Sequence, residues 1–109
     1  MKYRFEVQGS VAEPYVVIIE RSGSNLRATC DCAAGVNGLI CKHRLSLFKG
    51  SDTGVVGGDR DKIGDLPALL SGTDVERAMQ LLAVAEIAEA KAKKELSLAK
   101  QAVAKAMQS

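Results

Sequence analysis

Residues 30–43 of the chain read CDCAAGVNGLICKH and contain all of its cysteines and its only histidine. The pattern is C-x-C-x8-C-x-H, formed by Cys30, Cys32, Cys41 and His43. A redox group, or three unrelated buried thiols beside a stray imidazole, would be the alternatives. Three cysteines cannot all pair as disulfides, and chance clustering is a poor explanation. Because zinc takes thiolate sulfur and imidazole nitrogen in tetrahedral geometry, the stretch predicts one zinc ion per chain.

The number of ligands predicts what this metal does. Three cysteines and one histidine complete a tetrahedral set, whereas a catalytic zinc usually keeps one position open for water or substrate. We therefore expect a structural metal, no enzyme and no small-molecule substrate. A thiol redox enzyme is disfavoured because the metal would occupy every thiol.

The spacing within each half of the pattern suggests how the ligands converge. If residues 28–32 are extended, Cys30 and Cys32 point to the same face of a strand. A turn leading into a helix would bring Cys41 and His43 from the other side. The small residues between the halves include Asn37-Gly38, a strong tight-turn signal.

The flanking sequence predicts three strands and a short helix. Alternating apolar residues indicate a half-buried strand over 2–8, the β-branched run over 15–19 indicates a central strand, and 26–32 forms a third. Residues 42–49 predict a helix closed by Gly50. We assign the aromatic side chains in this region to the core, in preference to a stacking surface for single-stranded nucleic acid: Tyr3, Phe5, Tyr15 and Phe48.

The run over residues 5–50 resembles the SWIM-type zinc finger. The family pattern C-x-C-xn-C-x-H maps onto the four ligands without a gap, and the resemblance extends to Val7, Gly9-Ser10, Tyr15, Val17, Asp31, Gly35, Gly38 and Lys42. It implies strands before the ligands and a short helix after them. Such fingers occur in chromatin remodellers, transposases, ubiquitin ligases and many bacterial proteins. They are generally regarded as modules for binding DNA or protein.

Residues 51–72 change in character. Glycine and aspartate dominate, which predicts a linker between the finger (1–50) and a C-terminal segment (73–109). A phosphate-binding loop at 54–58 is disfavoured because the G-K-[ST] ending is missing. Residues 66–70 could form one helical turn, docked on the finger or on the following helix.

The segment 73–109 predicts one long helix. Thr73-Asp74-Val75-Glu76 is a capping-box pattern, and no glycine or proline follows it. A narrow apolar stripe recurs at spacings of four and three: Leu81, Ala85, Ala88, Ala92, Leu96, Ala99, Val103 and Ala106. We favour self-association of this helix as a coiled coil, or its docking onto another protein, over a solitary solvated helix.

Charge gives the nucleic-acid hypothesis modest support. The net charge is +2, and residues 1–50 carry seven basic and four acidic side chains. The basic residues near the ligands in sequence are Arg27, Lys42, Arg44 and Lys49, the predicted nucleic-acid-binding set. The favoured function is binding of DNA or another nucleic acid through this surface. The alternative is a protein-interaction adapter acting through the C-terminal helix.

Together these patterns predict an α+β chain: a zinc-stabilised β-β-(β)-α finger, a linker and a long helix. A finger of about 50 residues buries little apolar surface, so we expect it to unfold without zinc. The first residues are charged and alternating, and the longest apolar run is far too short to span a membrane. Zinc-binding thiols favour a reducing compartment. The expected location is intracellular: cytoplasmic, or nuclear if the host is a eukaryote.

Overall fold

The first three strands form an antiparallel meander and place the first zinc ligand. They are β1 (Lys2–Val7), β2 (Tyr15–Ser22) and β3 (Asn25–Cys30). The register sets Phe5 opposite Val17 and Val17 opposite Cys30. All three side chains are buried, so Cys30 continues a row of core residues across one face of the sheet. The alternation in the sequence of residues 2–8 is confirmed for β1, and the central strand predicted over residues 15–19 is confirmed by β2, which has a neighbour on each side.

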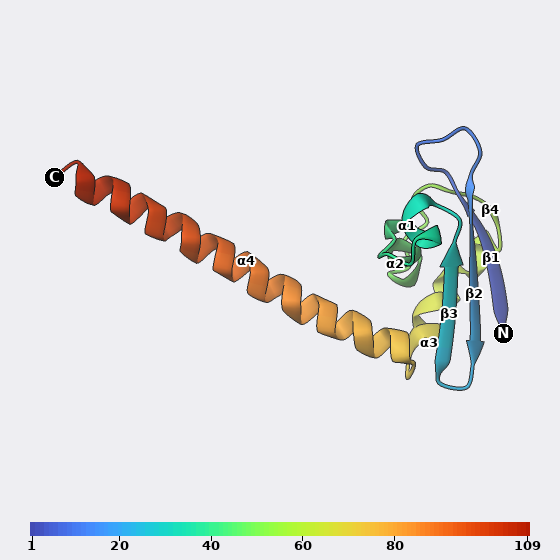
Figure 1. Ribbon diagram of the computed structural model, residues 1–109. Helices are drawn as coiled ribbons and strands as arrows, with labels where there is room; N and C mark the ends of the chain where they lie inside the picture. The colour runs from blue at the N-terminus through green and yellow to red at the C-terminus, as the bar shows by residue number, and fades with distance from the viewer. The chain divides into compact units, whose positions relative to one another are not determined.

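The computed structural model describes all 109 residues, in two compact units: Met1–Glu76 and Arg77–Ser109. The first unit is of the mixed α+β class, with four antiparallel strands in the order β3-β2-β1-β4. Helices α1 (Ala33–Val36) and α2 (Lys42–Phe48) follow β3 in the chain (Figure 1). The buried Leu47 and Phe48 of α2 add to the core of this unit.

Residues 51–72 differ from the expected linker. Val55–Gly58 forms strand β4, which pairs with β1, and Val55 is buried. Gly58 has a φ of +83°, and any side chain there would collide with the carbonyl of Arg4. Asp59 then donates its N–H to the Arg4 carbonyl (2.7 Å) and accepts the Arg4 N–H on its carboxylate (2.8 Å). Glycine in this segment therefore permits close pairing rather than preventing structure.

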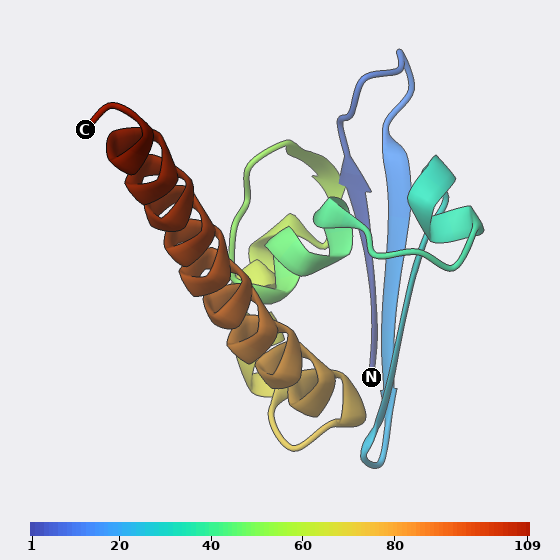
Figure 2. The same ribbon diagram turned by 60° about the vertical axis from the view of Figure 1, so that its left-hand side comes forward.

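The rest of this segment completes the core of the first unit. A 3₁₀ helix, η1 (Arg60–Asp65), leads into α3 (Leu66–Leu70). Figure 2 shows these two elements beside the sheet. Leu66 is fully buried and Leu69 nearly so. The Arg21 guanidinium donates to the carbonyls of Leu69 and Ser71, both at 2.8 Å, which ties the end of α3 to β2. The expected helical turn at 66–70 is confirmed, docked within the first unit.

The longest element is α4 (Asp74–Met107), as the sequence predicts. Its start is held within the first unit. The Thr73 hydroxyl accepts the Glu76 N–H (3.2 Å), the Glu76 carboxylate accepts the Gly72 N–H (3.1 Å), and the Asp74 carboxylate accepts the Leu26 N–H (3.1 Å). The first bond satisfies an N–H group that a helix start leaves unpaired, and the third ties the start of α4 to β3. The second unit consists of the remainder of α4 and the last two residues, and no residue of α4 is buried.

Candidate metal centre

The four cysteine and histidine side chains meet at the junction of three short elements. Cys30 is the last residue of β3, Cys32 is the N-cap of α1, Cys41 is the N-cap of α2, and His43 lies in the first turn of α2. Their ligand atoms all lie within 4.8 Å of one another. The cysteines are buried and the histidine is half-buried.

The spacing of these atoms fits zinc. The Cys32 and Cys41 sulfurs are 3.4 Å apart. His43 Nδ1 lies 3.5 Å from the Cys41 sulfur and 3.7 Å from that of Cys30. A tetrahedral zinc with Zn–S of about 2.3 Å and Zn–N of about 2.0 Å needs ligand atoms roughly 3.5–3.8 Å apart. The cluster is therefore positioned to bind one zinc ion, with all four coordination positions supplied by the chain.

The C-x-C half is built differently from the expected extended strand. β3 ends at Cys30, and the chain then turns into α1, where the Cys32 sulfur accepts the N–H of Gly35 (3.3 Å). A side chain at Gly35 would collide with the backbone of Cys30, so glycine allows α1 to close against the strand. Between the two cysteines, the Asp31 carboxylate accepts the N–H of Val16 (2.8 Å). Asp31 thereby anchors both ligands to β2.

Arg44 has a structural role that its sequence position does not reveal. Its guanidinium donates to the Ala28 carbonyl of β3 (3.0 Å) and to the Leu39 carbonyl (2.6 Å) in the connection to α2. The side chain thus joins the strand that carries Cys30 to the segment that leads into Cys41. Arg44 was predicted to contact nucleic acid, but the structure directs its guanidinium to the protein backbone.

Burial and hydrogen bonds give two of the thiols different acidities in the metal-free protein. Burial raises the pKa of Cys30 to about 12, opposed in part by the backbone N–H of Cys32. Burial acts on Cys41 in the same direction. There, however, the N–H of Arg44 and hydrogen bonds from the Cys32 and Cys30 thiols outweigh burial and lower the pKa to about 6. The Cys41 thiol therefore loses its proton more readily than the Cys30 thiol, whose proton must leave before the Cys30 sulfur can serve as a ligand.

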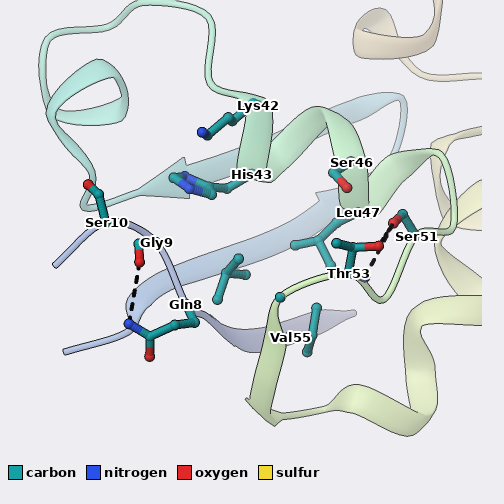
Figure 3. A pocket seen from close by; sticks show the side chains of 12 residues that line it. Gln8, Gly9, Ser10, Lys42, His43, Ser46, Leu47, Ser51, Thr53 and Val55 are labelled. Carbon is teal, nitrogen blue, oxygen red and sulfur yellow. Dashed lines mark hydrogen bonds between the residues drawn. The ribbon is translucent and has the colours of Figure 1, made fainter. Parts of the chain in front are cut away.

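His43 connects the metal site to the surface. Because Nδ1 faces the sulfurs, Nε2 is the nitrogen that can carry the ring proton once Nδ1 is a ligand. The ring centroids of His43 and Tyr15 are 5.0 Å apart, so Tyr15 packs beside the imidazole. His43 also lines a cleft, and Figure 3 shows its ring and the Lys42 side chain projecting from the first turn of α2.

The cleft has a volume of about 440 Å³ and lies between α2, the end of β1 and residues 51–55. Hydroxyl groups line it on several sides, and Ser51 donates to Thr53 at 3.1 Å within it (Figure 3). Its polar lining residues are Gln8, Ser10, Lys42, His43, Ser46, Ser51 and Thr53. Sequence reasoning did not identify Ser51 and Thr53, because residues 51–55 were expected to be a linker.

The remaining predicted basic residues do not form one surface. Arg27 is exposed on β3, where it faces away from the buried Leu26 and Cys30 and lies beside Lys2 and Glu20. Lys42 and Lys49 are exposed at the two ends of α2. Seven positions separate these two lysines, so they lie on the same side of the helix. The structure therefore places Lys42 and Lys49 on one side of α2 and leaves Arg27 apart from them.

Comparison with known proteins identifies the finger. The family model described as SWIM zinc finger matches residues 12–49, which contain β2, β3, α1, α2 and all four ligands. No curated protein and no solved structure matches the chain. No helix combines the length and apolar character needed to cross a membrane. The match and the geometry of the cluster agree, and the chain carries a SWIM zinc finger at residues 12–49 with Cys30, Cys32, Cys41 and His43 placed to hold one zinc ion.

Proposed function

We propose that this chain is a zinc-stabilised module that binds nucleic acid, with a phosphate backbone lying along the cleft beside His43. The chemistry of the cleft lining carries the proposal. An ammonium, an imidazole and several hydroxyl groups line it, and no carboxylate does. Phosphate oxygens are bound by lysine, by serine and threonine hydroxyls and by N–H donors. The cleft offers each of these through Lys42, Ser46, Thr53 and the His43 Nε2–H.

The exposed side of α2 extends this surface. Lys42, Ser46 and Lys49 are spaced by four and then three residues, so they follow one line along the helix. At 1.5 Å per residue, Lys42 and Lys49 are separated by roughly 10 Å along the axis. One backbone could therefore contact both lysines and the hydroxyl between them. We call Lys42, Ser46 and Lys49 the α2 basic line.

The size of this surface sets the expected strength. Two lysine contacts to duplex DNA would give a slope of about −1.8 in log affinity against log salt concentration, and about −1.4 on a single strand. With residues 1–50 carrying only a small excess of positive charge, binding should be weak, with the shallow salt dependence that these slopes describe. The metal stabilises the fold in this proposal and does no catalysis, because protein ligands fill its coordination. Such thiolate ligands suit a reducing, intracellular location.

Fluorescence anisotropy with labelled single-stranded and duplex oligonucleotides tests the proposal. The zinc-loaded protein is titrated over a series of salt concentrations, together with the variant K42Q/K49Q. We expect wild type to bind at low salt and the double variant to bind at least about tenfold more weakly, because two phosphate contacts are lost. Zinc content is measured for each protein, since Lys42 lies between two ligands.

R27Q is the control for loss of charge away from the cleft. It removes one positive charge from the other face of the sheet, so binding should stay within about twofold of wild type. Absence of binding at low salt would remove nucleic acid as the direct partner. Unchanged affinity of K42Q/K49Q, or a larger loss in R27Q, would place the contact elsewhere.

A protein-interaction role has separate support. It rests on α4, which has no buried residue and carries exposed leucine, valine and methionine side chains. The two functions use different parts of the chain and are compatible.

A further inference from the structure

Helix α4 presents a stripe of exposed apolar side chains. It is 34 residues long and contains no buried residue. Leu81 is 70% exposed and Met107 is 80% exposed. An exposed line of apolar side chains along a helix is typical of a helix that packs against a partner, although three further exposed apolar residues of α4 lie off this line: Val84, Ile87 and Leu98.

The stripe repeats every 11 residues. Positions 81, 92 and 103 are Leu, Ala and Val; positions 85, 96 and 107 are Ala, Leu and Met; positions 88 and 99 are both Ala. Eleven residues make three turns of about 3.67 residues each, so the stripe runs almost parallel to the helix axis. Two such helices can pack along the whole stripe with little supercoiling. The many alanines let the two backbones approach closely.

Charge is distributed unevenly along α4, and this distribution selects an orientation. Residues 74–90 contain four acidic side chains and one arginine, whereas residues 91–107 contain five lysines and one glutamate. Two copies packed in parallel would set acidic half against acidic half and lysine-rich half against lysine-rich half. Antiparallel packing sets each acidic half against a lysine-rich half.

We propose that α4 pairs with α4 of a second copy of this chain in antiparallel orientation, with Glu89 of each helix next to Lys100 of the other. These two residues are 11 positions apart, so they occupy the same place beside the stripe. A twofold axis near residues 94 and 95 brings both pairs together.

In the same register Ala92 lies opposite the partner's Ser97, and Ala85 lies opposite the partner's Ala104. Small side chains thus face one another, which lets the two helices approach closely. Within one helix Glu89 already contacts Lys93 at 2.7 Å, with both side chains largely exposed. The second lysine from the other copy would extend that pair into a network.

The stripe is narrow and rich in alanine, so the interface belongs to the small and weak class. Self-association should therefore depend visibly on concentration. A dimer would carry two zinc fingers, which would make the proposed nucleic-acid binding bivalent. The pairing itself does not depend on that function.

Charge-reversal variants of the full zinc-loaded chain, studied by sedimentation equilibrium, test the orientation. Protein concentrations run from about 5 to 500 µM, because small interfaces are weak. In E89K both intermolecular pairs become lysine against lysine, and in K100E both become glutamate against glutamate. Each variant alone should dimerise at least about tenfold more weakly than wild type. An equimolar mixture restores two opposite-charge pairs in the heterodimer, so the mixture should dimerise within about threefold of wild type.

Two variants on the far side of the helix serve as controls. K94E makes the same change as K100E, and A90K adds a lysine one position from Glu89; both should dimerise as wild type does. Far-ultraviolet circular dichroism checks that E89K stays helical after losing its contact to Lys93. A wild-type monomer at every concentration overturns the proposal. A mixture no tighter than the single variants overturns the antiparallel orientation, because only that arrangement brings positions 89 and 100 together.

Discussion

Arg44→Ala should weaken zinc binding although Arg44 is not a ligand. The guanidinium donates two hydrogen bonds, to Ala28 in β3 and to Leu39 ahead of Cys41. A hydrogen bond from a charged donor contributes about 1.5–3 kcal/mol when shielded. Leu39 is 61% exposed, so water can replace the guanidinium at its carbonyl and that bond contributes less. We estimate a total loss of about 2 kcal/mol, which corresponds to roughly a 30-fold loss of zinc affinity.

Competition with a chelator of known zinc affinity at fixed pH measures this loss. The matched control is Lys42→Ala. It removes a positive charge that lies next to His43 in sequence, as Arg44 does, but it breaks no hydrogen bond found in the structure. K42A should hold zinc within about threefold of wild type. If R44A also stayed within threefold, Arg44 would not position the ligands. If R44A lost nucleic-acid binding while keeping zinc, the role suggested by its sequence position would be restored.

Three further predictions concern the fold and the metal. Leu66→Ala should lower the free energy of unfolding of the zinc-loaded protein, measured in urea, by about 2–5 kcal/mol because Leu66 is fully buried. The control L39A should change this free energy little, because Leu39 is exposed. A decrease below about 0.5 kcal/mol for L66A would indicate that residues 51–72 are only a connector. Zinc uptake at pH 7.5 should release at least one proton, from Cys30, and a pH-indicator titration that showed no release would contradict this. The apparent zinc affinity should fall at least about tenfold for each pH unit by which the pH is lowered. The fall should be steeper below a pH of about 6, where Cys41 also takes up a proton. Chelation should lower the melting temperature by at least about 10 °C, and an unchanged melting curve would show that the fold does not need the metal.

The sequence predicted the ligands and the early strands well because their signals are local. Cysteine and histidine have a chemistry that few other residues share, the alternation around Phe5 records a strand with one buried face, and the β-branched run around Val17 records an interior strand. Strand β4 has no such signal. Gly57 and Gly58 carry no side-chain pattern, and the strand exists because β1 offers it a free edge.

The role of Arg44 was beyond sequence reasoning for a similar reason. Lysine and arginine near a metal site look alike in a count of charge, but only the fold shows that two backbone carbonyls meet the Arg44 guanidinium. Lys42, two positions earlier, has no such partner and stays exposed. Arg27 was separated from the other basic residues because successive strand residues face opposite sides of a sheet.

X-ray absorption spectroscopy at the zinc edge tests the central claim most directly. The purified chain, with its zinc content measured beforehand, should contain one zinc ion. The first coordination shell should show three sulfur atoms at about 2.3 Å and one nitrogen at about 2.0–2.1 Å. A shell that included a water oxygen, or fewer than three sulfurs, would contradict a closed site built from Cys30, Cys32, Cys41 and His43.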